Sequence, residues 1–397
     1  MDGLRVLVAP SGFKECLTAE AVAAAIARGV RRANPRAAIV ELPVADGGEG
    51  FAVTLASATG GTLKTTRVTG PVGQPVDAMW SVLGGNFAET AVIDMASAAG
   101  LSLVPRDRRD PLTTTTYGVG ELIRAALDAG IRHIVFGCGD SGTNDGGAGM
   151  ASALGARFLD AQGRPIAPGG GGLLALDWID LSDLDPRLAE TRIEVACNIR
   201  NLLCGPRGVA QVYGPQKGAS PAQVALLTQA LDRFAGAVEQ ATGIDVTLRP
   251  GCGASGGLGA GLHALLGARL HPRYDLVARY LDLDAQLAAA DLVLTAEGGL
   301  DGQSGEGKIP GELGMRAQKL GIPVIALAGT IGLRADTLRR HGIGAYFSTV
   351  MTPCSLRVAM AGAEDHIEAC AENVMRTVML SMGIATRGPR TPARRAA

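Results

Sequence analysis

Short apolar runs alternate along this chain with longer segments in which apolar residues recur at a helical spacing. Runs of four to eight apolar residues are typical of buried strands, and the longer segments are typical of amphipathic helices. Regular alternation of the two predicts an α/β protein built on largely parallel sheets. At 397 residues, the chain is long enough for two or three domains, each with its own core.

The pattern is clearest near the two ends of the chain. Residues 4–9 are predicted to form a buried strand, which is followed by a helix from Thr18 and a strand at 38–42. Toward the other end, strands at 291–295 and 323–328 flank a helix at 311–320. A helix at 119–128 and a strand at 131–136 lie between these parts, so the whole chain fits the α/β class.

Composition argues against several classes of function. The net charge is −1 and aromatic residues make up 4% of the chain, which disfavours nucleic-acid and anionic-membrane partners. The seven cysteines show no CxxC and no Cys/His cluster, so neither a disulfide framework nor a zinc site is expected. No signal peptide and no apolar run of about 18 residues is present, and we expect a cytoplasmic protein without a membrane partner.

Lysine is rare but concentrated in glycine-rich loops. Only five of the 37 basic residues are lysine, and three of the five stand beside glycines, namely Lys14, Lys217 and Lys308. A lysine presents a compact ammonium on a flexible stem, and neighbouring glycines let the backbone approach a ligand closely. This combination favours a phosphate site, although exposed loops also attract charge for no functional reason.

Carboxylates occur in three further glycine-rich loops, each shortly after a predicted strand. The loops span residues 45–50, 141–147 and 296–301, and they carry Asp46, Asp145, Glu297 and Asp301. Carboxylates beside bare backbone can hold Mg²⁺ or deprotonate a hydroxyl, while glycine amide N–H groups donate to phosphate oxygens. Each loop alone could be an ordinary Asp-Gly turn, but together they predict a site at the carboxyl edge of a sheet.

Three well-known catalytic patterns are incomplete here. Residues 137–142 fit GxGxxG but lack the clean helix start of a dinucleotide site. Residues 302–308 resemble a P-loop, yet Ile309 stands where the metal-binding hydroxyl belongs. Residues 253–257 match GxSxG without a strand leading into it, so Gly256 and Gly257 are better interpreted as part of an anion-binding loop before a helix.

Taken together, several segments resemble the type I glycerate kinases, and the resemblance extends from residue 4 to residue 385. The segments that carry it occur in the same order along the chain, at residues 9–14, 43–50, 114–121, 143–149, 214–218 and 256–261. The collinear order of so many motifs is highly specific to that family.

The resemblance implies ATP-dependent phosphorylation of glycerate, usually at its 2-hydroxyl to give 2-phosphoglycerate, with Mg²⁺. It also implies two α/β domains with the active cleft between them. The first is a discontinuous flavodoxin-like (Rossmann-like) domain of residues 1–84 and 289–385, and the second is an inserted mixed α/β domain of residues 85–288. The basic residues 386–397 are expected to form a disordered tail.

The chain departs from the family pattern at three positions. Ser11 stands in a segment where the family has an additional aspartate, Asn198 stands at an aspartate position, and Gly299 stands at an arginine position. An amide is neither a base nor a charged metal ligand, and a lost arginine removes a bidentate clamp for carboxylate or phosphate. Two alternatives therefore remain open: a kinase of another small hydroxy acid, and a catalytically weak nucleotide-binding paralogue.

The candidate site residues fall into three groups. The catalytic candidates are Lys14, Asp46, Asp145 and Asn198; the substrate- and phosphate-binding candidates are Ser11, Lys217, Gly256, Gly257 and Lys308; the metal candidates are Glu297 and Asp301. The expected ligands are ATP, Mg²⁺ and a small hydroxy acid. A homo-oligomer, the phosphorylated hydroxyl and the choice of catalytic base stay open at this point.

Overall fold

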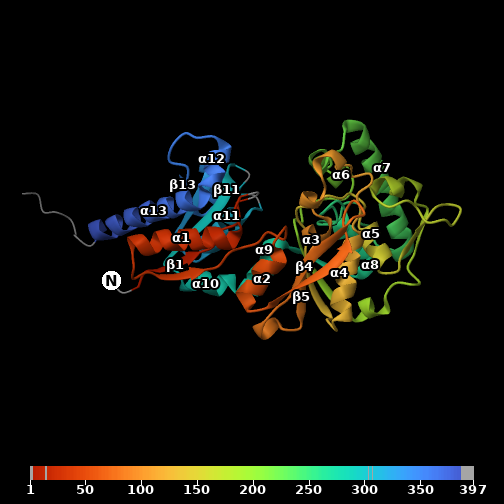
Figure 1. The fold of residues 1–397 in the computed structure, drawn as a ribbon, viewed down its shortest axis with the longest axis horizontal. Helices are drawn as coiled ribbons and strands as arrows, with labels where there is room; N and C mark the ends of the chain where they lie inside the picture. The colour runs from red at the N-terminus through yellow and green to blue at the C-terminus, as the bar shows by residue number, and fades with distance from the viewer. Residues whose placement is uncertain (1–2, 14–15, 303, 306, 386–397) are drawn as a thin grey trace, which may run out of the picture. The chain divides into compact units, whose positions relative to one another are not determined.

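The computed structural model describes residues 3–13, 16–302, 304–305 and 307–385. The chain divides into two compact units, of which unit 1 comprises Met1–Val44 and Asp282–Ala397, and unit 2 comprises Ala45–Leu281. Figure 1 shows strands covered by helices in both units, which confirms the predicted α/β class. Lys14 and the predicted disordered tail at 386–397 lie outside the described residues.

Unit 1 contains one parallel sheet with the topology of a flavodoxin-like fold. Its elements are β1 (Arg5–Val8), α1 (Ala19–Ala33), β2 (Ala38–Glu41), α10 (Leu283–Ala289), β11 (Leu292–Leu300), α11 (Ile309–Lys319), β12 (Val324–Ile331), β13 (Ile343–Ser348), α12 (Leu356–Ala361) and α13 (Ala363–Ala385). The strand order is β13-β12-β11-β1-β2, which becomes 5-4-3-1-2 when strands are counted within the unit. The order reverses between β1 and β11, so a ligand site is expected beyond the carboxyl ends of these two strands.

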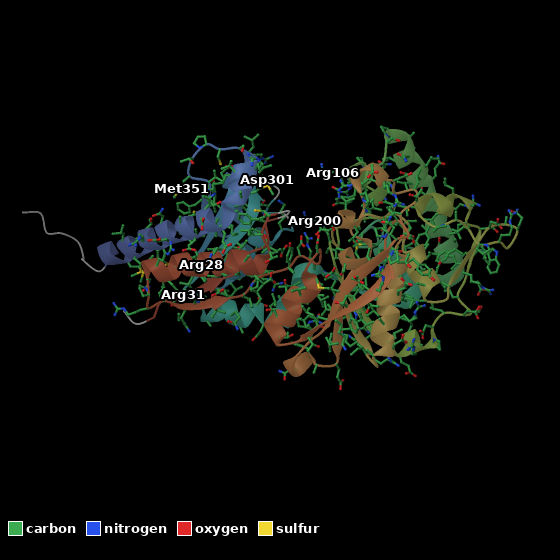
Figure 2. The ribbon with its side chains drawn as sticks, viewed as in Figure 1. Arg28, Arg31, Arg106, Arg200, Asp301 and Met351 are labelled. Atoms are coloured by element: carbon green, nitrogen blue, oxygen red, sulfur yellow. The ribbon has the colours of Figure 1, made fainter. Side chains whose placement is uncertain are left out.

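Helices α1 and α13 lie side by side over one face of this sheet (Figure 1). The Thr18 side chain accepts a hydrogen bond from Ala21 N and so caps α1, as its N-terminal position predicts. Val22, Ile26 and Val30 then follow at helical spacing and are buried in the shared core. Arg28, labelled in Figure 2, pairs with glutamates of α13 on the outer side of the same contact.

Unit 2 contains the remaining elements. They are α2 (Phe51–Thr59), β3 (Thr62–Thr69), β4 (Pro75–Val82), β5 (Thr90–Asp94), α3 (Ala96–Ala99), α4 (Tyr117–Asp128), β6 (His133–Gly137), α5 (Ala148–Ala153), β7 (Arg157–Leu159), β8 (Trp178–Asp180), β9 (Arg192–Cys197), α6 (Val209–Tyr213), α7 (Pro221–Thr242), α8 (Leu258–Leu266), β10 (Arg269–Pro272) and α9 (Arg273–Leu281). Strands β7 and β8 form a separate antiparallel pair.

The main sheet of unit 2 has six strands in the order β10-β9-β6-β5-β4-β3. Strands β10, β9, β6 and β5 are parallel, and the β4–β3 hairpin continues the sheet antiparallel. Asp94 is paired with Gly137, Gly137 with Ala196, and Cys197 with Pro272. The loops that follow β5, β6, β9 and β10 therefore all leave from one edge, which we call the carboxyl edge of unit 2.

The unit boundaries differ from the boundaries expected at residues 84 and 289. Residues 45–84 belong to unit 2, because β4 pairs with β5 and carries β3 with it into the six-stranded sheet. An antiparallel hairpin can extend either sheet, and its own residues do not specify which neighbour it joins. The second boundary falls at Asp282, directly after α9.

Gly29 sets the distance between α1 and α13. A methyl group added at Gly29 would lie 2.3 Å from Glu368 O and 2.8 Å from Glu372 N, both backbone atoms of α13. We predict that Gly29→Ala destabilises unit 1 by about 1–3 kcal/mol, the usual cost of overpacking, despite the better helix propensity of alanine.

Gly236→Ala in α7 is the matched control, because nothing lies within 4 Å of its added methyl. That change should stabilise the protein by about 0.5–1 kcal/mol through helix propensity alone. Thermal and urea unfolding followed by circular dichroism measures both variants. Equal effects of the two substitutions would contradict the close contact at Gly29.

Candidate functional site

The predicted residues of unit 1 lie near the point where its strand order reverses. Ser11 follows β1, and both its backbone N–H and its hydroxyl donate to Ala296 O at 2.9 Å. Glu297 is the next residue of β11, and its Oε1 lies 3.1 Å from Lys308 Nζ. A lysine–carboxylate pair thus stands at the switch point of a flavodoxin-like sheet, where open α/β folds bind their ligands.

The loop between β11 and α11 places Lys308 and Asp301. Lys308 precedes the first turn of α11, and its Nζ donates to Ser304 Oγ at 3.3 Å. Ser304 N donates to Asp301 Oδ1 at 3.2 Å, which closes a turn within the loop. Gly298 and Gly299 end the strand, and a methyl group at Gly299 would lie 3.0 Å from Thr330 Oγ1. These contacts bring Glu297, Asp301 and Lys308 into one group.

Asp46 lies at the carboxyl edge of unit 2 in a loop of nearly bare backbone. Its Oδ1 accepts a hydrogen bond from Gly48 N at 3.1 Å, and its Oδ2 lies 3.6 Å from Arg273 Nη1. A methyl at Gly139 would lie 2.6 Å from Gly48 Cα, so the Asp46 loop rests directly on the loop after β6. The Asp46 side chain remains 35% exposed, which leaves it accessible to a substrate.

Asn198 and Asp140 lie at the same edge. Asn198 follows β9, is half-buried, and accepts a hydrogen bond from Arg200 N at 3.1 Å through its Oδ1. Asp140 follows β6 with φ at 50°, a left-handed conformation that is uncommon for residues other than glycine. Its Oδ2 accepts from Glu49 N at 3.2 Å. The edge therefore carries carboxylate and amide side chains from several consecutive loops.

Asp145 is buried and heavily hydrogen-bonded, with 1% of its surface exposed. Its carboxylate accepts hydrogen bonds from the N–H groups of Thr116, Gly147 and Gly149 and from the hydroxyls of Thr115 and Thr116. Burial raises the pKa of Asp145, and these donors oppose that rise by stabilising the charge. The carboxylate thus joins the start of α4 to the loop before α5. Thr116 stands at the N-cap position of α4, but its hydroxyl binds Asp145 and makes no helix cap.

Lys217 is also buried, with 2% of its surface exposed. Its Nζ donates to Ser141 Oγ at 2.8 Å and to Thr143 O at 2.6 Å, so it braces the loop that carries Asp145. Burial lowers the pKa of Lys217 to about 7, although the nearby Asp145 charge favours the ammonium form. The sequence favoured phosphate binding for this lysine, whereas both of these hydrogen bonds are to protein groups.

The two predicted glycines, Gly256 and Gly257, pack against the same loop. A methyl at Gly256 would lie 1.9 Å from Thr143 O, and one at Gly257 would lie 2.9 Å from Gly146 Cα. Asp145, Lys217, Gly256 and Gly257 therefore form one cluster in unit 2. Ser11, Glu297, Asp301 and Lys308 form another in unit 1, and Lys14 lies outside the described residues.

Several side chains that sequence reasoning did not select also belong to the unit 2 cluster. Thr143 Oγ1, both polar atoms of the Asn144 side chain, Ser255 Oγ and Arg109 Nε are buried without a hydrogen-bond partner among the described residues. The sequence contains no signal for this property, because it depends on which groups the fold brings near. Buried polar atoms in proteins are normally paired, so these atoms call for a physical explanation.

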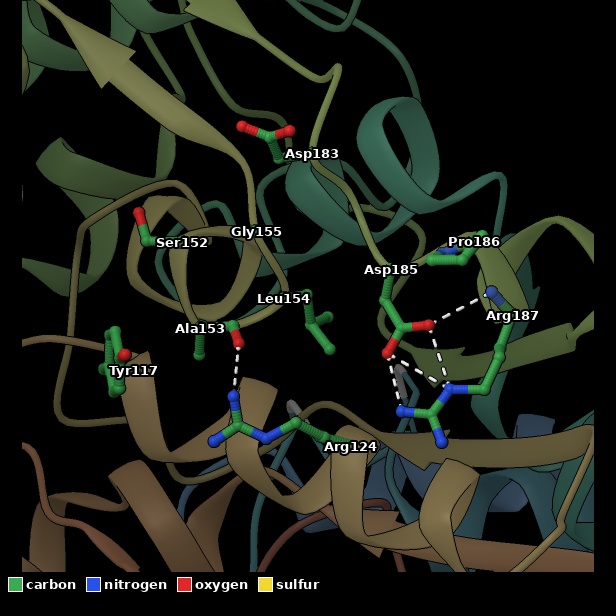
Figure 3. Close-up of a pocket in the computed structure, with 10 residues that line it drawn as sticks. All are labelled: Tyr117, Arg124, Ser152, Ala153, Leu154, Gly155, Asp183, Asp185, Pro186 and Arg187. Carbon is green, nitrogen blue, oxygen red and sulfur yellow. Dashed lines mark hydrogen bonds and ion pairs between the residues drawn. The ribbon is translucent and has the colours of Figure 1, made fainter.

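A surface hollow of about 580 Å³ in unit 2 is separate from these groups (Figure 3). It is lined by Tyr117, Arg124, Ser152, Ala153, Leu154, Gly155, Asp183, Asp185, Pro186 and Arg187. Its charged side chains already have protein partners: Arg187 pairs with Asp185, and Arg124 donates to Ala153 O. None of the predicted site residues lines this hollow.

Across the described ranges, no three His, Cys, Asp or Glu side chains converge in a way that could hold a metal ion. Within those ranges there is also no helix long and apolar enough to span a membrane. The seven cysteines are all free thiols, in agreement with the expected lack of a disulfide framework.

Comparisons with known proteins agree with the sequence resemblance. Residues 6–379 match the model of the glycerate kinase family. The chain is 44% identical to the glycerate 2-kinase of Escherichia coli K12 over 96% of this chain and 99% of that protein. It is equally similar, at 44%, to the glycerate kinase of Bacillus subtilis 168 over 95% and 98% of the two chains.

A solved structure supports the same conclusion. The crystal structure of a candidate glycerate kinase 2 from Salmonella typhimurium LT2 superposes with a TM-score of 0.82 at 44% identity. The match covers 96% of this chain and all of that chain (100%). The resemblance thus includes the fold as well as the motifs.

Because Lys217 is buried, the free energy of unfolding of this protein should depend on pH. Its pKa is lowered from 10.5 to about 7 in the folded protein, so between these values the unfolded chain binds more protons. The free energy of unfolding then rises with pH across this window, at most by about 1.4 kcal/mol per pH unit. We predict that the wild type gains stability between pH 7 and pH 9 relative to Lys217→Met, as measured by urea unfolding at each pH.

Lys64→Met serves as the control, since Lys64 is an exposed lysine of the same unit. Its stability should follow that of the wild type at every pH. Parallel curves for the wild type and Lys217→Met would show that Lys217 keeps an ordinary pKa in the folded protein.

Proposed function

This chain belongs to the glycerate kinase family, and on that premise we propose that it transfers the γ-phosphoryl group of ATP to the 2-hydroxyl of glycerate, giving 2-phosphoglycerate and ADP. The observation that carries the proposal is the Lys308–Glu297 pair at the switch point of the flavodoxin-like sheet. An ammonium that attracts phosphate oxygens there lies beside a carboxylate that suits a divalent cation. Phosphoryl transfer needs chiefly this combination of positioning and charge.

The residues of unit 1 fit ATP phosphates and Mg²⁺. Protein-bound Mg²⁺ is usually held by one or two carboxylates together with substrate phosphates, and Glu297 and Asp301 supply such oxygens. When bound, Mg²⁺ neutralises charge on the transferring phosphates. Lys308 would contact the phosphate oxygens in place of its present partners, Ser304 Oγ and Glu297 Oε1. Lys14, outside the described residues, remains a candidate for the same role.

Asp46 is a better candidate for the general base than Asp145. Asp145 is buried and already accepts hydrogen bonds from five protein donors, whereas Asp46 is 35% exposed. In the proposed step, Asp46 takes the proton of the 2-hydroxyl while the hydroxyl oxygen bonds to the γ-phosphorus. The bond between that phosphorus and its bridging oxygen breaks, and ADP leaves with the electron pair.

Asp145 and Lys217 would act by holding the loop of residues 141–147 in place. The carboxylate joins Thr116 to Gly147 and Gly149, and the ammonium binds Thr143 O in the same loop. A fixed loop keeps the Gly256–Gly257 segment in position for an anionic group of a substrate. Asn198 would supply an amide at the edge, where it can donate to a substrate oxygen but cannot act as a base.

A second candidate function is the phosphorylation of a different small hydroxy acid. The departures at Ser11 and Gly299 favour it, because both lie in the unit 1 group and both lack a charge that the family pattern has there. Selection for one small carboxylate would be weaker without the arginine. ATP turnover across glycerate, tartronate and larger polyhydroxy acids distinguishes the two functions, with NMR locating the phosphoryl group. ATP binding without turnover of any acid would contradict both.

Removal of the proposed base gives the sharpest test of mechanism. We predict that Asp46→Asn lowers kcat/KM for the true acceptor by at least about 100-fold, the range for a lost general base. The KM for ATP should change little, because Asp46 is assigned to the acceptor hydroxyl. Steady-state kinetics with each substrate varied in turn measures the effect.

Asp77→Asn is the matched control, since Asp77 lies on β4 and pairs with Arg67 on an exposed surface. It should leave kcat/KM within roughly twofold of the wild type, as expected for a residue without a positioned acid–base role. A loss below about threefold for Asp46→Asn would remove Asp46 from the role of base.

A further inference from the structure

The loop before α8 has an unusual backbone. Ser255, Gly256 and Gly257 all have positive φ, at 52°, 71° and 91°. Their N–H groups donate to no acceptor among the described residues, whereas Gly253 N and Ala254 N on one side and Gly259 N on the other are bonded within the fold. Helix α8 begins directly afterwards and runs for nine residues. Consecutive free amides at a helix N-terminus form a concave site for an anion.

Unpartnered buried side chains adjoin this loop. Thr143 and Asn144 are both 0% exposed, and their side-chain oxygen and nitrogen atoms have no hydrogen-bond partner among the described residues. A methyl at Gly256 would lie 1.9 Å from Thr143 O and 2.9 Å from Asn144 Cα, so the two segments are in direct contact. Ser255 Oγ is likewise buried and makes no hydrogen bond of ordinary geometry, although the Cys138 thiol lies close enough to interact with it.

Arg109 adds a cation on the other side of Lys217. A methyl at Gly218 would lie 2.2 Å from Arg109 O, and Lys217 Nζ donates to Thr143 O, so Arg109, Lys217 and Thr143 follow one another in space. Arg109 Nε is buried without a partner, and no ion pair of its guanidinium is found among the described residues. Its chain neighbour Asp110 binds Leu112 N and Gln223 Nε2 instead.

A structural explanation alone does not account for these atoms. Each unsatisfied buried polar group costs about 1–3 kcal/mol, and a guanidinium costs more. Here Thr143, Asn144 and Ser255 adjoin one loop whose amides are also free, and Arg109 lies beyond Lys217 from that loop. The charges of the cluster favour an anionic ligand. The negative charge of Asp145 is already satisfied by five donors, whereas Arg109 is a cation and Lys217 is partly protonated near neutral pH.

We propose that Arg109, Thr143, Asn144 and Ser255, together with the amides of Ser255, Gly256 and Gly257, bind one oxyanion group of a substrate. The group is a phosphate of the nucleotide or the carboxylate of the hydroxy acid, which present similar oxygens to N–H and O–H donors. The assignment of the ligand as a kinase substrate rests on the proposed function. Occupation of the site would give every one of these buried donors an acceptor.

Ligand-induced stabilisation tests the site without requiring turnover. The Tm of the wild type is measured with inorganic phosphate, ADP and glycerate separately, and a ligand of the folded state raises it. Arg109→Ala and Asn144→Asp should reduce that rise, the second because a carboxylate of the same shape repels an anion. We predict a roughly 10- to 100-fold weaker apparent affinity, the range for hydrogen bonds to a charged group. Arg106→Ala, at an exposed arginine labelled in Figure 2, should behave as the wild type.

The ligands whose stabilising effect is lost in the variants identify the oxyanion group that the site binds. A variant effect confined to ADP and phosphate assigns the site to the nucleotide, and an effect confined to glycerate assigns it to the carboxylate. Ser255→Ala, which removes one hydroxyl, should show a smaller loss for the same ligand even if Asn144→Asp folds poorly. If the wild type responds to none of the three ligands, or if all variants respond as the wild type does, the oxyanion site is overturned.

The same data separate this site from the proposed function. Suppose that the wild type phosphorylates no hydroxy acid, but that ADP raises its Tm and no longer raises the Tm of the variants. This result would reject the proposed reaction and retain the site. Glycerate turnover with unchanged KM values for ATP and glycerate in Arg109→Ala would reject the site and retain the reaction.

Discussion

The carboxyl edge of unit 2 depends on backbone lying directly against backbone at glycines. Methyl groups at Gly139 and Gly256 would lie 2.6 Å and 1.9 Å from backbone atoms of Gly48 and Thr143, closer than side-chain carbons approach in folded proteins. This proximity brings the Asp46 loop onto the loop after β6, and the loop of Asn144 onto the segment before α8. The same close contacts therefore set the positions of the side chains and backbone amides at this edge.

Two buried ions of opposite charge stabilise this arrangement in different ways. The Asp145 carboxylate is surrounded by N–H and O–H donors, which offset part of the cost of burying its charge, and it joins Thr116 to the loop of Gly147 and Gly149. The Lys217 ammonium has fewer partners, and burial brings its pKa to about 7. A group near neutrality can respond to an anion, since an added negative charge nearby favours its protonated form. Lys217 therefore links loop structure to the charge state of whatever binds beside it.

The fold was more predictable from sequence than the site. The helices from Thr18 and around residues 119–128 were predictable because apolar spacing is a local property, as is the Thr18 cap of the first helix. The boundary near residue 84 was not, because the β3–β4 hairpin joins a sheet through pairing with β5. At the site, the chemistry-bearing loops could be found, since Asp46, Asp145, Glu297 and Lys217 stand among glycines. Whether such a residue faces a ligand or braces a loop depends on its burial and its partners, which only the fold decides. The sequence therefore did not show that Asp145 and Lys217 are buried, and it did not single out Arg109 and Asn144.

The three departures from the family pattern differ in how the fold accommodates them. The Ser11 hydroxyl donates to Ala296 O, and Asn198 accepts from Arg200 N, so neither residue leaves an unsatisfied group behind. Gly299 lies within β11 and contributes no side chain at all. The lost charges are thus absorbed without strain, while the positive charges of Lys308 in unit 1 and Arg109 and Lys217 in unit 2 remain in place. If the proposed sites hold, recognition of an anionic substrate would depend more on these cations and on free backbone amides than on an arginine near the end of β11, and such a site would select less strictly for the size of the hydroxy acid.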